Sequence, residues 1–444
     1  MLTILLVGAF LFADEAIPLS LIWKRALYLG TITSSVIASA IFPPKTITIL
    51  VYANAFLSAA FGLRAIELLI VNQPSHLKRL EKVFDGSSSS PIYFWKPMPP
   101  ALSYERLLYV VDLLINPRGI GWTHGSKKYL PHLKKMHPKS SAKNGNGSHT
   151  KQNGQQDTEK FILKEPTQNR LNFLGKEALK LVVAYLVYDA YRTVFGRNYG
   201  QLCVNFHAFL NSANVQSFFR HIGIKLQASP ETSAKIVRRF LLPPACWAAA
   251  YAFVDGIRAA LALYAVGGLY IVSPKLAGEP WMYPAIFGPW RYIFWPRLKD
   301  IWGKLWHDLC RRALITSSAA LIPRRTPAPL GRVLVGFLSF VISGVVHAAG
   351  TYAVTQDPYA VFMIMLFFIL LPFFIATQEI VSVQILERHL PDIFITRTII
   401  WLLDAGYLIW WGYHTAPWFF SYSMIPESLA SIPVLDGWSF WESS

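Results

Sequence analysis

The first residue of chemical interest is His347, which lies inside the apolar run Val333–Tyr352. An imidazole titrates near neutral pH and can accept a proton without a metal. An ionisable group inside a membrane-length helix is costly and usually faces the interior of the bundle. The small and polar residues that share its helix face, at spacings of three and four, are Gly336, Ser339, Ser343, His347 and Gly350. This stripe suits a catalytic face, and it equally suits a tight packing seam with a satisfied histidine.

A second histidine, His307, lies in the segment LKDIWGKLWHDLCRR, residues 298–312. Apolar residues repeat there at helical spacing, which predicts an amphipathic helix on the membrane surface. The charges that alternate in sign at i,i+4 are Asp300, Lys304, Asp308 and Arg312. Gly303 leaves open space one turn before the imidazole. On helix physics alone, the segment also fits an ordinary interfacial anchor, with Trp302 and Trp306 at the headgroups and a solvated histidine.

The elements that must position these histidines are apolar helices. The 444 residues are 53% hydrophobic and only 15% charged, a composition too apolar for an ordinary soluble protein. We therefore predict an all-α, polytopic transmembrane bundle of about nine spans, with further amphipathic helices at the interface. The predicted spans are Leu2–Ala13, Ala26–Phe42, Thr46–Leu63, Ala178–Phe195, Phe240–Val254, Ala259–Val272, Val333–Tyr352, Tyr359–Thr377 and Thr398–Tyr413. The first is interpreted as a short span rather than a cleavable signal, because it lacks a basic leader.

The charge distribution favours a membrane protein over a nucleic-acid-binding one. The net charge is +17, but the basic residues lie mostly between the apolar runs, where the positive-inside rule expects them. The stretch Lys134–Gln168 is rich in Lys, Asn, Gly and Ser, and we predict a disordered cytosolic loop there. The predicted units are therefore N-terminal transmembrane helices (1–115), a basic and largely disordered cytosolic loop (116–170) and a catalytic transmembrane core (171–444). Two short aromatic segments, Leu108–Ile115 and Trp281–Trp295, are placed at the membrane interface.

Several separate motifs together resemble one family. The run Pro284–Gly288 (PAIFG) precedes Trp302-Gly303 and Trp306-His307, and another histidine follows in an apolar helix. This order resembles the wax-synthase-like branch of the membrane-bound O-acyltransferases. The earlier run Asn116–Trp122 (NPRGIGW) is similar to a turn of fungal members.

The resemblance extends to fungal acetyltransferases of terpenoid and meroterpenoid pathways. It implies transfer of an acetyl group from acetyl-CoA, as co-substrate rather than bound cofactor, to a hydroxyl of a hydrophobic acceptor. Asp308 stands where glutamine is frequent in these relatives, and Ala285 where a second proline is often found. These departures bear on the identity of the acyl donor.

Acyl transfer to an alcohol requires removal of the hydroxyl proton and stabilisation of the charge on the thioester oxygen. We assign His347 as the general base, in agreement with the resemblance, with Ser343 one turn away to orient it. His307 is assigned to the acyl carbonyl. No Gly-x-Ser-x-Gly elbow and no Cys–His pair is evident, so direct transfer is preferred to an acyl-enzyme, and Cys310 is a spectator. No metal is predicted.

Substrate binding is assigned to residues around the two histidines. Those assigned are Trp302, Trp306, Ser343, Arg311 and Arg312, and coenzyme A phosphates would also meet Lys299 and Lys304. Each of these cations could equally be an ordinary positive-inside residue. Of the other charged residues in apolar runs, Asp255 and Arg258 are three apart and could neutralise each other. Asp189 and Asp404 would line an acceptor cavity or bind arginines structurally, and the structural interpretation is favoured.

Other functions are weighed against this one. A long-chain wax ester synthase would share the chemistry and the motifs. A transporter also has many spans with scattered polar residues, but no repeated halves with broken helices are visible. Eleven dispersed histidines do not favour a di-iron oxygenase, and a non-catalytic scaffold leaves the two motif histidines unexplained. The expected partners are membrane lipid, an acyl-CoA and a hydrophobic alcohol, with no nucleic acid and a homo-oligomer left open, in a multi-pass protein of the endoplasmic reticulum.

Overall fold

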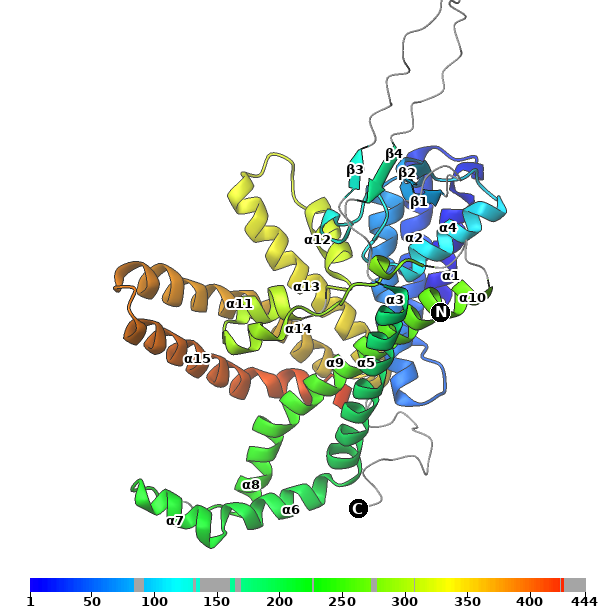
Figure 1. Ribbon diagram of the computed structural model, residues 1–444. Coiled ribbons are helices and arrows are strands. Elements are labelled where there is room, and N and C mark those ends of the chain that lie inside the picture. Colours follow the sequence, from blue (N-terminus) through cyan, green and yellow to red (C-terminus); the bar gives the residue numbers. More distant parts are fainter. Residues whose placement is uncertain are drawn as a thin grey trace, which may run out of the picture.

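The structure is a computed structural model that describes residues 1–83, 92–130, 133–135, 160–163, 169–225, 227–272, 278–306, 308–423 and 425–426. Helices dominate it (Figure 1). The N-terminal helices are α1 (Leu2–Ala13), α2 (Leu21–Ile41), α3 (Thr48–Ala65) and α4 (Tyr104–Ile115), followed after the basic region by α5 (Arg170–Tyr191), α6 (Tyr199–Leu210) and α7 (Ala213–His221). The remaining helices are α8 (Pro230–Ile236), α9 (Leu242–Leu263), α10 (Leu269–Val272), α11 (Leu298–Asp300), α12 (Arg311–Ala320), α13 (Ala328–Thr355), α14 (Pro358–Glu379) and α15 (Phe394–Phe420).

The predicted membrane class is confirmed, but the count of nine spans is not. Four helical stretches among the described residues are long and apolar enough to cross a membrane. They are Thr48–Val71, Pro230–Val272, Ala328–Thr355 and Pro358–Glu387. The spans predicted at Phe240–Val254 and Ala259–Val272 are parts of one continuous helical stretch, so their separation was wrong. The charged residues between them, Asp255 and Arg258, pair with each other and do not interrupt it.

Arg258 is the residue that allows α9 to continue through this charged turn. Its guanidinium donates to Asp255 at 2.6 Å on the same helix and to Glu177 of α5 at 2.5 Å. The predicted neutralisation of Asp255 by Arg258 is thus confirmed, with Glu177 as an additional partner. The buried Arg258–Glu177 pair helps to join α5 to α9, which pack along each other.

A four-stranded antiparallel sheet interrupts the otherwise helical fold, and it was not predicted. Its strands are β1 (Lys78–Val83), β2 (Ile92–Pro97), β3 (Leu133–Lys135) and β4 (Lys160–Leu163), in the order β1-β2-β4-β3. Strands β3 and β4 fall within the stretch expected to be disordered, and residues 136–159 and 164–168 of that stretch lie outside the described residues. The sheet lies beside the N-terminal helices (Figure 1).

Two hydrophobic cores hold the helices that carry the site. The N-terminal core joins α1, α2, the end of the α3 stretch and α4 around Trp122, which is 1% exposed. The second joins α13, α14 and α15 around Phe367 and Phe368. Asp357 precedes helix α14 and caps it, because its carboxylate accepts from the backbone N–H of Tyr359 at 2.9 Å. Helix α13, which carries His347, packs against both α14 and α3. It therefore connects the N-terminal helices to the C-terminal ones.

Asp404 of α15 is the buried carboxylate that ties α15 to α14 and to the start of α11. It is 3% exposed, accepts from Arg297 at 3.0 Å and from Gln378 at 3.0 Å, and contacts Ser382. The structural interpretation of Asp404 is therefore confirmed. Asp189 of α5 is fully buried.

We expect Asp404→Ala to destabilise the protein by about 3–5 kcal/mol, because it removes the buried partner of Arg297 and takes one hydrogen-bond acceptor from Gln378. Thermal unfolding in detergent measures this as a lower midpoint. The control is Asp392→Ala, since the Asp392–Arg397 pair is exposed and should leave the midpoint unchanged. Equal midpoints for the two variants would contradict the expectation.

Candidate active site

His347 lies on α13 in an aromatic enclosure, with one ring nitrogen in contact with a hydroxyl. Its Nδ1 is 3.1 Å from the hydroxyl oxygen of Tyr52 on α3. The imidazole stacks on Phe368 with ring centroids 4.9 Å apart, and the edges of Phe56 and Phe419 meet it at 5.0 and 5.5 Å. Three helices besides its own therefore fix the ring in an apolar setting.

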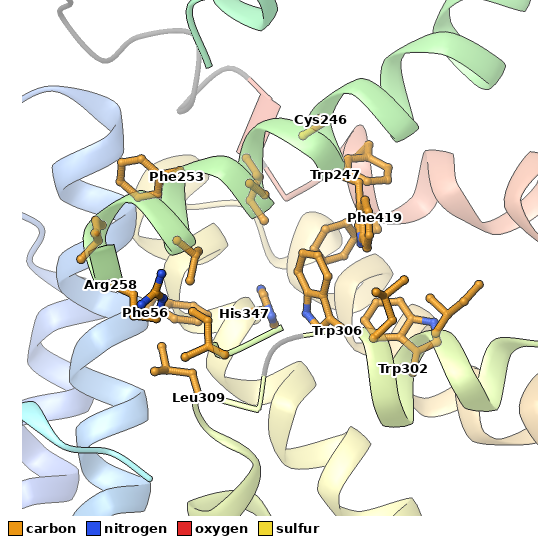
Figure 2. Close-up of a pocket in the computed structure, with 18 of the residues that line it drawn as sticks. Phe56, Cys246, Trp247, Phe253, Arg258, Trp302, Trp306, Leu309, His347 and Phe419 are labelled. Atoms are coloured by element: carbon orange, nitrogen blue, oxygen red, sulfur yellow. The ribbon is translucent and has the colours of Figure 1, made fainter. Parts of the chain in front are cut away.

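The imidazole of His347 lines a large, partly open cavity of about 1020 Å³. In Figure 2 it lies between Phe56 on one side and Trp306 on the other. The walls are mostly aromatic and aliphatic and come from the α3 stretch, α4 and the following turn, α9, residues 282–309, and helices α13, α14 and α15. Trp302 and Trp306, both assigned to substrate binding, line this cavity with His347. A cavity of this size can hold a drug-sized apolar molecule.

The motif segment does not form the single helix expected over residues 298–312. It is helical from Leu298 to Leu305, ends at Trp306, whose backbone is extended, and resumes as α12 at Arg311. The break is stabilised by backbone pairing with the PAIFG run. The N–H of Gly288 donates to the carbonyl of Leu305, and the N–H of Asp308 to that of Ile286, both at 2.9 Å. A local helical pattern cannot reveal this non-local competition for backbone hydrogen bonds.

His307 itself lies outside the described residues. Its two neighbours are described: Trp306 lines the cavity and Asp308 takes part in the backbone pairing. The assignment of His307 to the acyl carbonyl therefore stays a prediction.

The expected charge ladder of the motif forms only in part. Lys304 pairs with Asp300 at 2.6 Å, as predicted. The predicted continuation through Asp308 and Arg312 does not form, because the helix is broken between them. Asp308 contacts Arg118 and Tyr129, and Arg312 contacts Glu67.

Arg312 belongs to a buried polar cluster rather than to the cavity wall. Glu67, which is fully buried, pairs with both Arg64 and Arg312. His124 lies beside them, and burial, together with the two arginines, lowers its pKa to about 2, so the imidazole is neutral. Arg64 also donates to the carbonyl of Asn116 at 3.0 Å. This cluster therefore fastens the NPRGIGW turn to the end of the α3 stretch and the start of α12.

The structure does not bring every assigned residue to the cavity. Ser343, Arg311 and Arg312 are absent from its lining, and Tyr52, rather than Ser343, contacts the ring of His347. Burial raises the pKa of the Cys310 thiol to about 11, so it carries little thiolate. Within the described ranges, no three His, Cys, Asp or Glu side chains are grouped to hold a metal ion.

Sequence reasoning missed two residues of this site. Tyr52 gave no signal, because a tyrosine in an apolar span is ordinary and its partner is 295 residues away. Arg118 stood inside the NPRGIGW motif, but the motif alone gave it no partner. It lines the cavity and donates to the carbonyl oxygens of Pro284 at 2.6 Å and Ala285 at 3.0 Å.

Comparison with known proteins relates the segment that carries the motifs to one family. Residues 283–370, which include the PAIFG run, the tryptophans of the motif and His347, match the membrane bound O-acyl transferase family. The chain is 25% identical over 260 residues to Acetyltransferase eriL of Hericium erinaceus, covering 57% of this chain and 51% of that protein. It is 33% identical over 88 residues to Acetyltransferase ple2 of Rhodocybe pseudopiperita, covering 18% of this chain and 22% of that protein.

These matches confirm the predicted resemblance to the membrane-bound O-acyltransferases and to fungal acetyltransferases. The chain spans about half the length of the first relative and about a fifth of the second. No solved structure shows a significant match.

Two glycines of the stripe on α13 give a matched test of the His347 setting. A Cβ at Gly350 would lie 2.8 Å from the ring of Tyr52, whereas a Cβ at Gly336 would meet nothing within 4 Å. We expect Gly350→Ala to displace Tyr52 from His347 and lower the midpoint of thermal unfolding. Gly336→Ala should leave the midpoint unchanged or raise it, since alanine is the better helix former. Equal behaviour of the two variants would show that the close Tyr52–α13 contact is not important.

Proposed function

We propose that the chain is an O-acyltransferase that moves an acyl group, most simply acetyl from acetyl-CoA, to a hydroxyl of a hydrophobic acceptor. The observation that carries this proposal is the ring of His347 in the wall of a large apolar cavity, together with Trp302 and Trp306 of the family-matched segment. The names of the two relatives support acetyl as the acyl group. The resemblance to terpenoid and meroterpenoid enzymes supports a polycyclic alcohol as the acceptor. We propose that the protein is a multi-pass protein of the endoplasmic reticulum.

In this proposal His347 is the general base. With Nδ1–H donating to the Tyr52 oxygen, Nε2 holds the lone pair and accepts the proton of the acceptor hydroxyl. The alcohol oxygen then forms a bond to the thioester carbonyl carbon, and the carbon–sulfur bond breaks. The departing thiolate takes the proton from the imidazolium, which restores the neutral ring. His307 would donate a hydrogen bond to the oxyanion of the tetrahedral intermediate.

The apolar walls support this chemistry by excluding water. Water in the cavity would compete with the alcohol and hydrolyse the thioester. The aromatic rings around His347 also offer flat surfaces to a polycyclic acceptor. Both ligands must be present together, because we assign no residue of the chain as a covalent acyl carrier.

The ion pairs of the four cations assigned to coenzyme A reduce the number of candidates for binding its phosphates. Lys299 pairs with Glu379, Lys304 with Asp300 and Arg312 with Glu67. Arg311 is the member of this group that forms no ion pair with a carboxylate among the described residues. We therefore propose Arg311 as the first contact of a coenzyme A phosphate.

The central test is release of free thiol from acetyl-CoA by the purified protein with a panel of terpene and steroid alcohols. We expect alcohol-dependent release, reduced by about 10²–10⁴-fold in His347→Ala because a positioned base is lost. The control is His221→Ala, which removes an exposed histidine of α7 and should keep full activity.

Full turnover by a folded His347→Ala protein would contradict the assignment of the base. Transport of an alcohol into vesicles without thiol release would favour the transporter alternative. An assay with palmitoyl-CoA beside acetyl-CoA distinguishes an acetyltransferase from a wax ester synthase. Faster thiol release from palmitoyl-CoA would favour the wax ester synthase.

Tyr52→Phe tests the orientation of the base separately. This variant keeps the ring and removes the hydroxyl that contacts Nδ1, so we expect kcat to fall by about tenfold, the value of one net hydrogen bond. The KM for acetyl-CoA should change little. Tyr104→Phe alters a tyrosine of α4 that is 73% exposed and serves as the control. An unchanged kcat in Tyr52→Phe would mean that His347 is oriented by its aromatic neighbours alone.

A further inference from the structure

Arg118 joins three segments that are far apart in the sequence. It belongs to the NPRGIGW turn, and its guanidinium donates to the carbonyl oxygens of Pro284 and Ala285, which belong to the PAIFG run. The same group contacts Asp308 Oδ1 at 3.3 Å in the motif segment. The Arg118 side chain is only 8% exposed. A planar guanidinium with several donors suits such a three-way contact, which the single ammonium of lysine cannot reproduce.

Tyr129 holds the other oxygen of the same carboxylate. Its hydroxyl donates to Asp308 Oδ2, and its ring lies under the guanidinium of Arg118 at 5.0 Å from the centroid. Burial and the hydrogen bond to Asp308 raise the pKa of Tyr129. Both carboxylate oxygens of Asp308 are therefore held from the side of the NPRGIGW turn and the residues that follow it.

Asp308 directly follows His307 in the sequence, and Leu305 lies two residues before His307. The backbone of Leu305 and Asp308 pairs with Gly288 and Ile286, so the motif segment is held against the PAIFG run at both of these residues. The contacts of Arg118 fix the side chain of Asp308 and the PAIFG backbone in the same place. A Cβ at Gly288 would lie 1.8 Å from the carbonyl oxygen of Lys304. The PAIFG run and the motif segment therefore approach so closely at this point that only glycine fits.

We propose that Arg118 is a positioning residue for acyl transfer, which clamps Asp308 and the PAIFG run together and thereby holds the motif segment whose Trp306 lines the cavity. This inference rests on the proposed function for its effect on turnover. It assigns a task to Asp308, which stands where glutamine is frequent in the family that the chain resembles. Arg118 acts through the motif segment and is not assigned a role in binding substrate.

Steady-state kinetics with acetyl-CoA and an accepted alcohol test the effect on turnover. Arg118→Ala and Asp308→Asn should each lower kcat by about tenfold or more, while KM for both substrates stays within about twofold. The double variant should be no slower than the slower single variant, because both substitutions remove the same contact. Guanidinium ion at millimolar concentration should restore part of the rate of Arg118→Ala. The control is Arg397→Ala, which breaks an exposed pair with Asp392 and should show neither loss nor rescue.

A raised KM with unchanged kcat in Arg118→Ala would overturn the proposal, since Arg118 would then hold substrate. Additive losses in the double variant would overturn it as well.

Amide hydrogen exchange tests the clamp without relying on turnover. In the native protein the peptides covering 284–290 and 304–310 should be protected, and in Arg118→Ala both should exchange faster while the peptides of α13 stay protected. Unchanged exchange in the two peptides would overturn the clamp. A protein that shows the faster exchange but releases no thiol in its native form would refute the proposed function and leave the clamp supported.

Discussion

The site depends on how the backbone is satisfied where the motif helix ends. When a helix stops inside an apolar protein, its last carbonyls and the following amides lose their partners, and each unsatisfied group is costly. Here the PAIFG run supplies the missing partners, since Ile286 and Gly288 pair with Asp308 and Leu305. The extended residue Trp306 can then reach the cavity instead of continuing around a helix. Non-helical backbone within a membrane protein is tolerated only where the protein satisfies it in this way.

The polar side chains near the cavity follow the same rule. Arg258 has Asp255 and Glu177, Arg118 has Asp308 and two carbonyls, and Nδ1 of His347 meets the hydroxyl of Tyr52. Each of these contacts joins different parts of the chain, apart from the local pair on α9. The polar groups therefore do two things at once: they avoid the cost of burial and they place one segment against another.

The sequence predicted the parts of this architecture that local pattern controls. Helix α1 has the bounds expected for the first apolar run, and α13 and α14 contain the runs expected around His347 and after it. The failures have a common cause in contacts between distant residues. The pairing of Leu305 with Gly288 broke the predicted motif helix, and Glu177 of α5 allowed two predicted spans to be one helix. In the sheet, β2 pairs with β4, which lies far away in the sequence. Periodicity and composition carry no record of such partners.

The cavity wall extends well beyond the segment shared with the family. Residues 283–370 supply His347 and both tryptophans, whereas Tyr52, Trp247 and Tyr413 come from α3, α9 and α15. The proposed base and most of the cavity wall are thus supplied by different stretches of the chain. Substitutions in α9 or α15 can therefore reshape the cavity without altering His347, which gives such a scaffold a simple route to a different ligand.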